Sequence, residues 1–335
     1  VLRKIMKFST YMYDWLYGEQ GYYSKYREIG KKGDFYTSVS ASKFFGGTIA
    51  KHIISVIDEG FLPSDTTICE IGAHKGYLLA DIVQFIYTLR PELLQTLSFA
   101  IVERFDFLQE EQRRYFQESF GDAVTLKQVK SLKELQLESA FFVANEIFDA
   151  FPCELIYKDK TATVVEGKIV FEEEESWVSE KAKKYHKDRG EIAVGYEEFA
   201  LEMKDSAKKF EFMTYDYGEM EARPDFSIRV YKDHEVFPLF DETLTLDDVF
   251  SVSDITYDVT FEHLKDAYEE ASIPMLEYKT QALALVDMGL LELLEILKKQ
   301  GGEEMYTHEV ERAKQLILPS FLGERFKMIR FRQGQ

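Results

Sequence analysis

Short apolar runs alternate with amphipathic segments along residues 66–146. Four apolar runs have the length of β-strands: residues 67–72, 98–103, 123–129 and 140–146. Between them, apolar residues recur at helical spacing over residues 76–89 and 105–119. Apolar strands that alternate with helices indicate parallel βαβ units, with helices on both faces of the sheet. The pattern therefore predicts an α/β fold built on a doubly wound, mostly parallel sheet.

Helical patterns flank this core on both sides. Before it, residues 3–17 and 40–59 each place apolar side chains on one helical face. After it, we expect helices over residues 261–271 and 278–299, and a last strand over residues 325–332 that returns to the core. We therefore divide the chain into three regions: a helical N-terminal or lid segment (1–65), the core (66–240) and a mainly helical substrate-side region (241–335).

The core region contains an insertion at about residues 155–208. Residues 155–172 alternate in the manner of a hairpin, and a strand pattern resumes over residues 210–216. Between these segments the chain is highly charged and includes the acidic run Glu172–Glu175. We expect a pair of solvated surface helices in this charged part, without a chemical role.

The overall charge narrows the classes of partner. The chain has 335 residues and a formal net charge of −19, which disfavours nucleic acid and anionic membrane surfaces. A cationic cofactor and a basic protein substrate suit that charge. Because no apolar stretch is long enough to span a bilayer and the N-terminus lacks the apolar part of a signal peptide, we expect a cytoplasmic protein without membrane insertion. The two cysteines, Cys69 and Cys153, indicate neither a disulfide framework nor a metal site.

A glycine-containing turn follows the first core strand. Residues 68–76 read Ile-Cys-Glu-Ile-Gly-Ala-His-Lys-Gly and lead into a helical pattern, so the turn would present backbone N–H groups and a helix dipole to a ligand. The dinucleotide signature Gly-x-Gly-x-x-Gly is incomplete here, whereas a carboxylate before a short glycine turn suits S-adenosyl-L-methionine (SAM), with its cationic amine and sulfonium. The same strand, turn and helix also occur in proteins without a ligand. The cofactor contacts predicted in this turn are Glu70, Gly72, Ala73, His74 and Gly76.

Acidic and amide residues follow the later strands of the predicted sheet. Glu103 follows the second strand, where a carboxylate can accept hydrogen bonds from both ribose hydroxyls of a nucleoside, or can instead cap the next helix. Asn145, Glu146 and Asp149 follow the fourth strand, and Asp216 ends the fifth. Such groups among aromatic residues are costly to bury unless they hold a partner. This set suits an amine or a guanidinium bound at the carboxyl edge of the sheet.

Taken in order, the motifs resemble those of the MidA family of SAM-dependent methyltransferases, which includes the mitochondrial complex I assembly methyltransferase. The stretch Asn145–Pro152 is close to the family's NElfDAlP signature and is the most specific match. Further matches run nearly from end to end of the chain: Gly21–Tyr23, Gly33–Ser38, Phe45-Gly46, Glu70–Ala73, Leu79–Asp81, Asp216–Gly218, Tyr231, His234, Asp254–Thr256, Val259, Thr280-Gln281 and Gly323–Lys327. Several motifs in the same order are hard to produce by chance.

The resemblance implies a Rossmann-like methyltransferase core, SAM as the cofactor, and methyl transfer to an arginine of a protein substrate. A subunit of respiratory complex I is the substrate that it suggests. Glu103 and Asn145 would complete the cofactor site begun by the glycine turn. The candidate catalytic carboxylates, which would face the substrate, are Glu146 and Asp149 first, then Asp34 and Asp216.

One residue departs from the family pattern, because His74 stands where the family has the middle glycine of Gly-x-Gly-x-Gly. Glycine there allows a positive φ and a close approach of the backbone. Histidine tolerates that conformation better than β-branched residues do, so we expect SAM binding to be retained. The alternative is a non-catalytic assembly or binding factor with a degenerate SAM loop, and a nicotinamide-dependent dehydrogenase is a more distant third. The sequence leaves the methyl acceptor open, and a homodimer is one open option for the oligomeric state.

Overall fold

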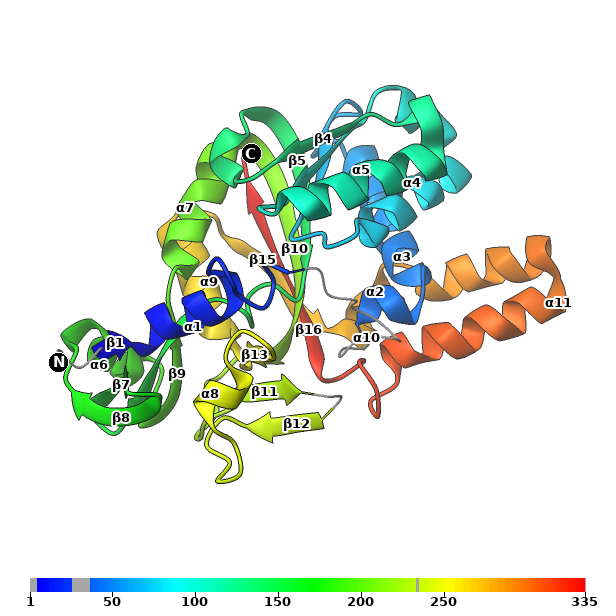
Figure 1. Cartoon of the computed structure of the whole chain (residues 1–335). Helices are drawn as coiled ribbons and strands as arrows, with labels where there is room; N and C mark the ends of the chain where they lie inside the picture. Colours follow the sequence, from blue (N-terminus) through cyan, green and yellow to red (C-terminus); the bar gives the residue numbers. More distant parts are fainter. Residues whose placement is uncertain (1–4, 26–36, 233–234, 335) are drawn as a thin grey trace. The chain divides into compact units, whose positions relative to one another are not determined.

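The computed structural model describes residues 5–25, 37–232 and 235–334 (Figure 1). Contacts divide the chain into two compact units, each made of three chain segments. Unit 1 comprises Val1–Phe35, Ile147–Phe199 and Tyr217–Glu270, and unit 2 comprises Tyr36–Glu146, Ala200–Asp216 and Ala271–Gln335. Among the helices of the described residues, none has the length and apolar character needed to cross a membrane.

Unit 2 is built on a mostly parallel sheet. Its strands are β2 (Thr67–Ile71), β3 (Ser98–Val102), β4 (Leu126–Val129), β5 (Leu137–Asn145), β10 (Ala207–Glu219, whose end belongs to unit 1), β15 (Met275–Thr280) and β16 (Phe326–Gln333). They follow the order β15-β16-β10-β5-β2-β3-β4. The pairs from β10 to β4 are parallel, and β15 pairs with β16 antiparallel. This sheet confirms the α/β class predicted from the alternating pattern.

Helices cover the sheet of unit 2 (Figure 1): α2 (Ser38–Ala41), α3 (Phe44–Asp58), α4 (Tyr77–Leu89) and α5 (Asp106–Phe120), with short 3₁₀ turns at Pro91–Gln95, Gly121–Ala123 and Leu132–Glu134. α3 and α4 lie close together, because a Cβ built on Gly46 would come within 2.7 Å of the Cβ of Asp81. Any side chain at Gly46 would push the two helices apart.

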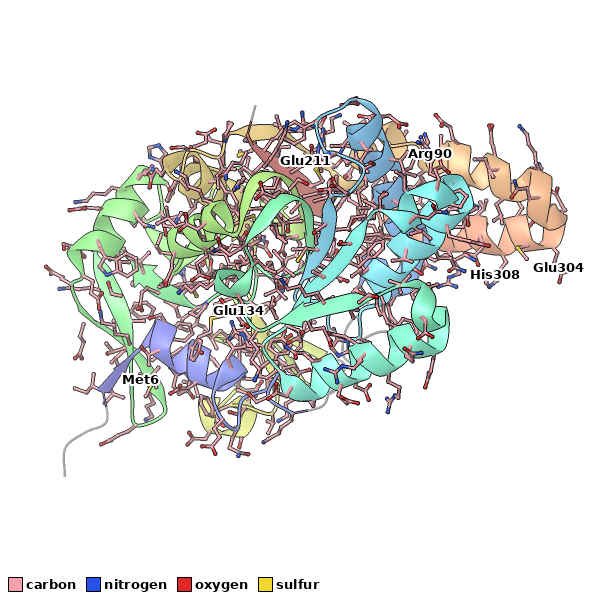
Figure 2. All side chains as sticks on the ribbon, turned by 90° about the horizontal axis from the view of Figure 1, so that it is seen from above. Met6, Arg90, Glu134, Glu211, Glu304 and His308 are labelled. Atoms are coloured by element: carbon pink, nitrogen blue, oxygen red, sulfur yellow. The ribbon has the colours of Figure 1, made fainter. Side chains whose placement is uncertain are left out.

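The C-terminal part of unit 2 forms a helical hairpin. After α10 (Gln281–Asp287) comes α11 (Leu290–Ile317), which turns at Gly302, where φ is 79° and ψ is 170°. Figure 2 shows Glu304 and His308 on this hairpin, which extends away from the sheet of its unit.

The prediction of a helix over residues 278–299 was wrong at the start of that range. Residues 275–280 form the strand β15 instead, because they pair with β16 from the end of the chain. Thr280 then begins α10, since its hydroxyl oxygen accepts a hydrogen bond from the N–H of Leu283 at 3.3 Å. The sequence showed the helical spacing but not the distant strand that captures its first residues.

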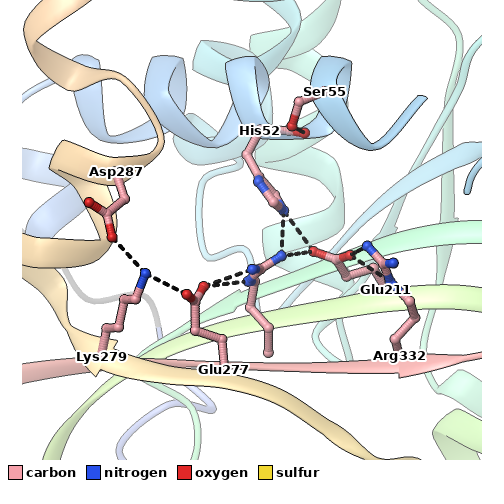
Figure 3. Close-up of polar contacts among 8 residues, drawn as sticks. His52, Ser55, Glu211, Glu277, Lys279, Asp287 and Arg332 are labelled. Atoms are coloured by element: carbon pink, nitrogen blue, oxygen red, sulfur yellow. Dashed lines mark hydrogen bonds and ion pairs between the residues drawn. The ribbon is translucent and has the colours of Figure 1, made fainter. Parts of the chain in front are cut away.

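A network of ion pairs joins strands of unit 2 to α3 (Figure 3). Glu211 on β10 has no exposed side-chain surface, and its carboxylate binds Arg330 at 2.8 Å and Arg332 at 2.6 Å, both on β16. The ring of His52 on α3 lies 2.7 Å from the same carboxylate. Glu277 on β15 binds the other side of Arg330 at 2.7 Å. The network therefore ties the antiparallel edge of the sheet to its parallel part.

Unit 1 contains two smaller sheets, with the orders β1-β7-β6-β9 (β8 pairs with β7) and β12-β11-β13. Their strands are β1 (Ile5–Lys7), β6 (Cys153–Tyr157), β7 (Lys160–Val165), β8 (Lys168–Glu173), β9 (Arg189–Ala193), β11 (Arg229–Lys232), β12 (Glu235–Pro238) and β13 (Asp254–Thr256). A short strand, β14 (Val259–Thr260), pairs with the end of β10. The helices are α1 (Phe8–Tyr17), α6 (Ser176–Lys184), α7 (Tyr196–Ser206, which continues into unit 2), α8 (Leu246–Val249) and α9 (Phe261–Glu270).

Two predictions for the segments of unit 1 were wrong. The helix expected over residues 3–17 begins only at Phe8, because residues 5–7 pair with β7 as a strand. The charged part of the insertion is not a helix pair alone, because β9 lies between α6 and α7 and pairs with β6. Residues 190–193 of β9 are buried, and this short buried run was hidden by the charges on either side.

Candidate functional site

The strand order of unit 2 reverses between β2 and β5. From β2 the chain proceeds to β3 and β4 on one side, and later to β5 and β10 on the other. Ile71 at the end of β2 is in register with Ala144, the residue before Asn145. In open α/β sheets, ligands bind outside the carboxyl ends of the strands at such a reversal. The structure therefore brings the glycine turn and Asn145 together at the edge where the sequence predicted a site.

The loop from β2 to α4 has three residues in the left-handed region of the backbone. The angle φ is 70° at Gly72, 47° at His74 and 79° at Gly76. A side chain on Gly76 would also meet the ring of Phe116 at 3.2 Å. His74 thus adopts a conformation that usually favours glycine, and the loop keeps its glycine-type path. Ala73 is buried between these positions.

Two glutamines hold this loop in place. Gln112 on α5 is fully buried, and its Nε2 donates a hydrogen bond to the carbonyl oxygen of His74 at 2.7 Å. The Nε2 of Gln128 on β4 donates to the Oε1 of Gln112 at 2.9 Å. Sequence reasoning missed both residues because neither stands in a glycine motif. The available signal was a polar residue, Gln112, on the apolar face of a predicted helix.

Glu70 caps the helix that follows the loop. It is 4% exposed, and its Oε2 accepts a hydrogen bond from the N–H of Leu79, in the first turn of α4, at 3.0 Å. Burial raises the pKa of Glu70 to about 8, although the bond from Leu79 acts in the opposite direction. The first N–H groups of a helix lack partners within it, so Glu70 fixes the loop as well as its own strand. This contact makes Glu70 a residue that positions the loop predicted to contact the cofactor.

Glu103 lies at the carboxyl end of β3, next to β2. Its side chain is mostly buried, and its Oε1 accepts a hydrogen bond from the N–H of Phe105 at 3.1 Å. Burial raises the pKa of Glu103 to about 7. Because Phe105 immediately precedes α5, this oxygen has the helix-capping role that the sequence offered as an alternative. In its ionised form, a carboxylate at this edge is well suited to accept hydrogen bonds from hydroxyl groups.

Asn145 and Glu146 lie at the end of β5. The Nδ2 of Asn145 donates to the Oε1 of Glu146 at 2.6 Å, whereas the Oδ1 of Asn145 is buried without a hydrogen-bond partner in the described structure. Glu146 has φ at 56°, and its N–H donates to the carbonyl oxygen of Tyr215 at 2.8 Å. A non-glycine residue with positive φ stores strain, which is concentrated at functional sites. Both features make this strand end a candidate binding position.

The remaining predicted carboxylates lie in different parts of the chain. Asp216 is fully buried in β10 and is the last residue of its segment in unit 2. Asp149 belongs to unit 1, because the boundary between the units falls between Glu146 and Ile147, within the NElfDAlP-like motif. Asp34 lies outside the described residues.

Asp149 has a buried polar environment of its own in unit 1. It is 5% exposed and accepts a hydrogen bond from the hydroxyl of Tyr217, which also bonds with the hydroxyl of Thr256 at 2.5 Å. The guanidinium of Arg229 lies 4.7 Å from the centre of the Tyr217 ring. The sequence identified Tyr217 as part of a motif but missed Arg229, since no spacing rule connects it with Asp149.

Comparisons with known proteins point in the same direction as this geometry. Residues 48–278 match the family described as "Putative S-adenosyl-L-methionine-dependent methyltransferase". The mitochondrial protein arginine methyltransferase NDUFAF7 of Danio rerio is 23% identical over 339 residues, covering 92% of this chain and 78% of that protein. Its counterpart from Homo sapiens is 23% identical over 348 residues, covering 92% and 75%. A Burkholderia thailandensis structure bound to S-adenosyl-homocysteine has a TM-score of 0.82 at 22% identity, covering 98% of this chain and 87% of that one, and shows the same fold.

Proposed function

Because the chain belongs to this MidA-like family of SAM-dependent methyltransferases, we propose that it methylates an arginine side chain of a protein. The relatives from Danio rerio and Homo sapiens support this acceptor, since both are named protein arginine methyltransferases. The net charge of −19 also suits a basic acceptor. A subunit of respiratory complex I is the substrate that the MidA resemblance suggests.

SAM is the cofactor, and the residues at the strand reversal fit it. The buried Oδ1 of Asn145 has no hydrogen-bond partner in the described structure, and a buried acceptor of this kind is costly unless a ligand or water satisfies it. This atom is the observation that carries the proposal, because SAM offers amine and hydroxyl donors. The loop Gly72–Gly76 would hold the methionine part of SAM, and Glu103 would hold the ribose hydroxyls.

The chain's own carboxylates would orient the acceptor and take up its proton. When bound, SAM supplies a methyl group carried on a sulfonium. An arginine guanidinium is protonated in water, so one of its protons must leave as a nitrogen gains the methyl group. A carboxylate beside the acceptor can align the guanidinium and accept that proton. We assign this role to Glu146 or Asp149, which belong to different units of the chain, with Asp216 and Asp34 as second candidates.

Asp149 has a pKa suited to this task. Burial raises the pKa of Asp149 to about 6, although the hydrogen bond from Tyr217 and the charge of Arg229 act to lower it. The carboxylate is therefore ionised at neutral pH and is a stronger base than an exposed aspartate. A general base is most effective when its pKa lies near the working pH.

Calorimetric titration with SAM and S-adenosyl-homocysteine tests the cofactor, and mass spectrometry of candidate acceptor proteins after incubation with labelled SAM tests the reaction. We expect SAM binding and a label on arginine. Replacing Asn145→Ala should weaken SAM binding by about tenfold, because a buried hydrogen bond is lost, whereas Gln117→Ala, an exposed amide on α5, should not. Absence of SAM binding at millimolar concentration would overturn the proposal, and a label only on other side chains would overturn the choice of acceptor.

A further inference from the structure

Four aromatic residues of unit 1 form a surface cluster, which we call the aromatic patch: Tyr157 at the end of β6, Phe171 on β8, Phe226 before β11 and Phe240 after β12. The ring centres of Phe226 and Phe240 are 4.6 Å apart, and Phe171 lies 6.0 Å from Phe226 and 6.1 Å from Phe240. Tyr157 extends the group, with its ring 5.9 Å from Phe171. Four segments distant in sequence thus contribute to one set of rings.

Much of the aromatic patch is open to solvent. Tyr157 and Phe240 each keep 40% of their surface exposed, and Phe171 and Phe226 are half-buried. Single exposed apolar residues are ordinary on a protein surface, whereas contiguous exposed groups of them are candidates for binding a partner.

The rings of the aromatic patch already hold cations from the chain itself. The guanidinium of Arg189 lies 5.4 Å from the ring centre of Tyr157 and 5.2 Å from that of Phe226, and it pairs with Asp225 at 2.9 Å. The ammonium of Lys158 lies 5.5 Å from the ring of Tyr157. Guanidinium groups bind aromatic faces through the ring quadrupole, so this surface has the chemistry to hold an arginine side chain.

Carboxylates accompany the rings along the chain. Each aromatic segment has an acidic residue within two positions: Asp159 near Tyr157, Glu172 after Phe171, Asp225 before Phe226 and Asp241 after Phe240. Three of these four acidic residues are solvent-exposed, and Asp241 is half-buried. Exposed rings on segments that also carry carboxylates are complementary to a basic segment, in which cations can use both rings and ion pairs.

We propose that the aromatic patch is a docking surface for an arginine-rich segment of the methyl-accepting protein. This inference rests on the proposed function in one respect, namely that the acceptor is a protein. Docking at the patch would hold the acceptor by a segment separate from the methylated residue. It should therefore affect the affinity for the protein acceptor and leave the affinity for SAM unchanged.

The test uses the full chain and a fluorescent peptide of alternating glycine and arginine, with binding measured by anisotropy without SAM. Replacing Phe240→Leu keeps an apolar side chain but removes the ring, so it should weaken peptide binding about two- to fivefold. Phe240→Trp should bind at least as tightly as the unmodified chain, because tryptophan offers the strongest ring face for a cation. Tyr87→Ala, which removes a still more exposed ring from unit 2 (66% exposed, against 40% for Phe240), is the control and should change nothing.

Equal peptide affinity in the Phe240→Leu, Phe240→Trp and unmodified chains would overturn the docking surface, as would a chain that does not bind the peptide. A melting curve confirms that each variant is folded, and Tyr157→Leu provides a second ring removal if Phe240→Leu does not fold. A patch-dependent peptide affinity in a chain that methylates no protein would leave the docking surface standing and reject the proposed function. Methylation of a protein with a KM that the patch variants do not raise would support the proposed function and reject the docking surface.

Discussion

The carboxylate of Glu70 accepts a hydrogen bond from the N–H of Leu79 at 3.0 Å, across the loop that joins β2 to α4. The bond connects the end of the buried strand β2 to the first turn of α4, so the residues between them have a fixed path. Gly72, His74 and Gly76 lie in this path with positive φ. The loop that would approach SAM is therefore held from its two ends by one side chain.

Glu70→Ala should weaken both the fold and the cofactor site. Loss of a helix-capping acceptor costs about 1 kcal/mol, and a loop no longer held should bind SAM less tightly. Glu70→Gln keeps an acceptor for Leu79 and should retain more of both. Urea unfolding and calorimetry measure the two effects, with Glu118→Ala, an exposed carboxylate of α5, as the control. Equal SAM affinity in Glu70→Ala and the unmodified chain would show that the cap does not support the site.

The pKa of Glu70 also predicts a pH dependence of stability. The folded pKa of about 8 lies above the ordinary value of 4.5, so the folded state binds more protons than the unfolded state between these values. The free energy of unfolding should therefore decrease as pH rises from about 4.5 to about 8. Glu70→Gln has no such proton, and its unfolding free energy should depend less on pH over this range. Urea unfolding of both chains at several pH values measures the difference, and parallel curves would contradict the assignment.

SAM binding should depend on the ionisation of Glu103. Burial raises the pKa of this carboxyl to about 7, and the ionised form is the better acceptor for ribose hydroxyls. SAM should bind more tightly as pH rises through 7. One pH unit below the pKa, it should bind about tenfold more weakly than to the fully ionised form. Glu103→Gln should lose this part of the slope, while any slope from the amine of SAM itself remains in both chains. Identical pH profiles from calorimetry would mean that Glu103 only caps α5.

The position of the candidate residues at the carboxyl edge of the sheet could be predicted, because each directly follows a strand in the sequence. Apolar runs mark the strands, and Glu103 and Asn145 follow two of them directly, so parallel pairing alone brings these residues to one edge. The hydrogen bond between Asp149 and Tyr217 could not be predicted in this way. It joins two strand-end segments through their side chains, and no period of the sequence encodes such a contact.

The prediction of secondary structure failed where a strand distant in the sequence determines the conformation. Residues 275–280 have a helical continuation but become a strand, because β16 pairs with them from about fifty positions later. The boundary between Glu146 and Ile147 was hidden for a related reason. It falls within one continuous motif, so neither composition nor a linker marks the change of unit.

Substitutions at His74 should separate backbone strain from cofactor binding. Because φ is 47° at this residue, His74→Val should destabilise the fold by about 1–2 kcal/mol, since a β-branched residue resists the left-handed region. His74→Gly should fold as well as the unmodified chain and bind SAM within tenfold of its affinity. His308→Gly, on the hairpin, is the control for SAM affinity. A gain of tenfold or more in His74→Gly would instead support a degenerate SAM loop in a binding factor.

The ion-pair network around Glu211 should protect the fold against acid. Burial alone would raise the pKa of Glu211, but the hydrogen bond with His52, the charge of Arg330 and the hydrogen bond from Arg332 lower it to about 2. Since the ordinary value is 4.5, the stabilisation is present above pH 4.5 and is lost as pH falls towards 2. Glu211→Ala should cost about 3–5 kcal/mol at neutral pH, because two partly buried guanidinium groups lose their carboxylate.

The matched control for Glu211 is an exposed ion pair that also involves β10 but joins it to β5. Glu138 on β5 binds Lys208 on β10 at 2.7 Å, with both side chains largely exposed, and Glu138→Ala should cost at most about 1 kcal/mol. Guanidinium unfolding at neutral and acidic pH compares the two variants with the unmodified chain. The stability lost in Glu211→Ala should shrink as the pH approaches 2, because Glu211 of the unmodified chain is then protonated. A loss that stays constant down to that pH would mean that Glu211 contributes packing and not charge.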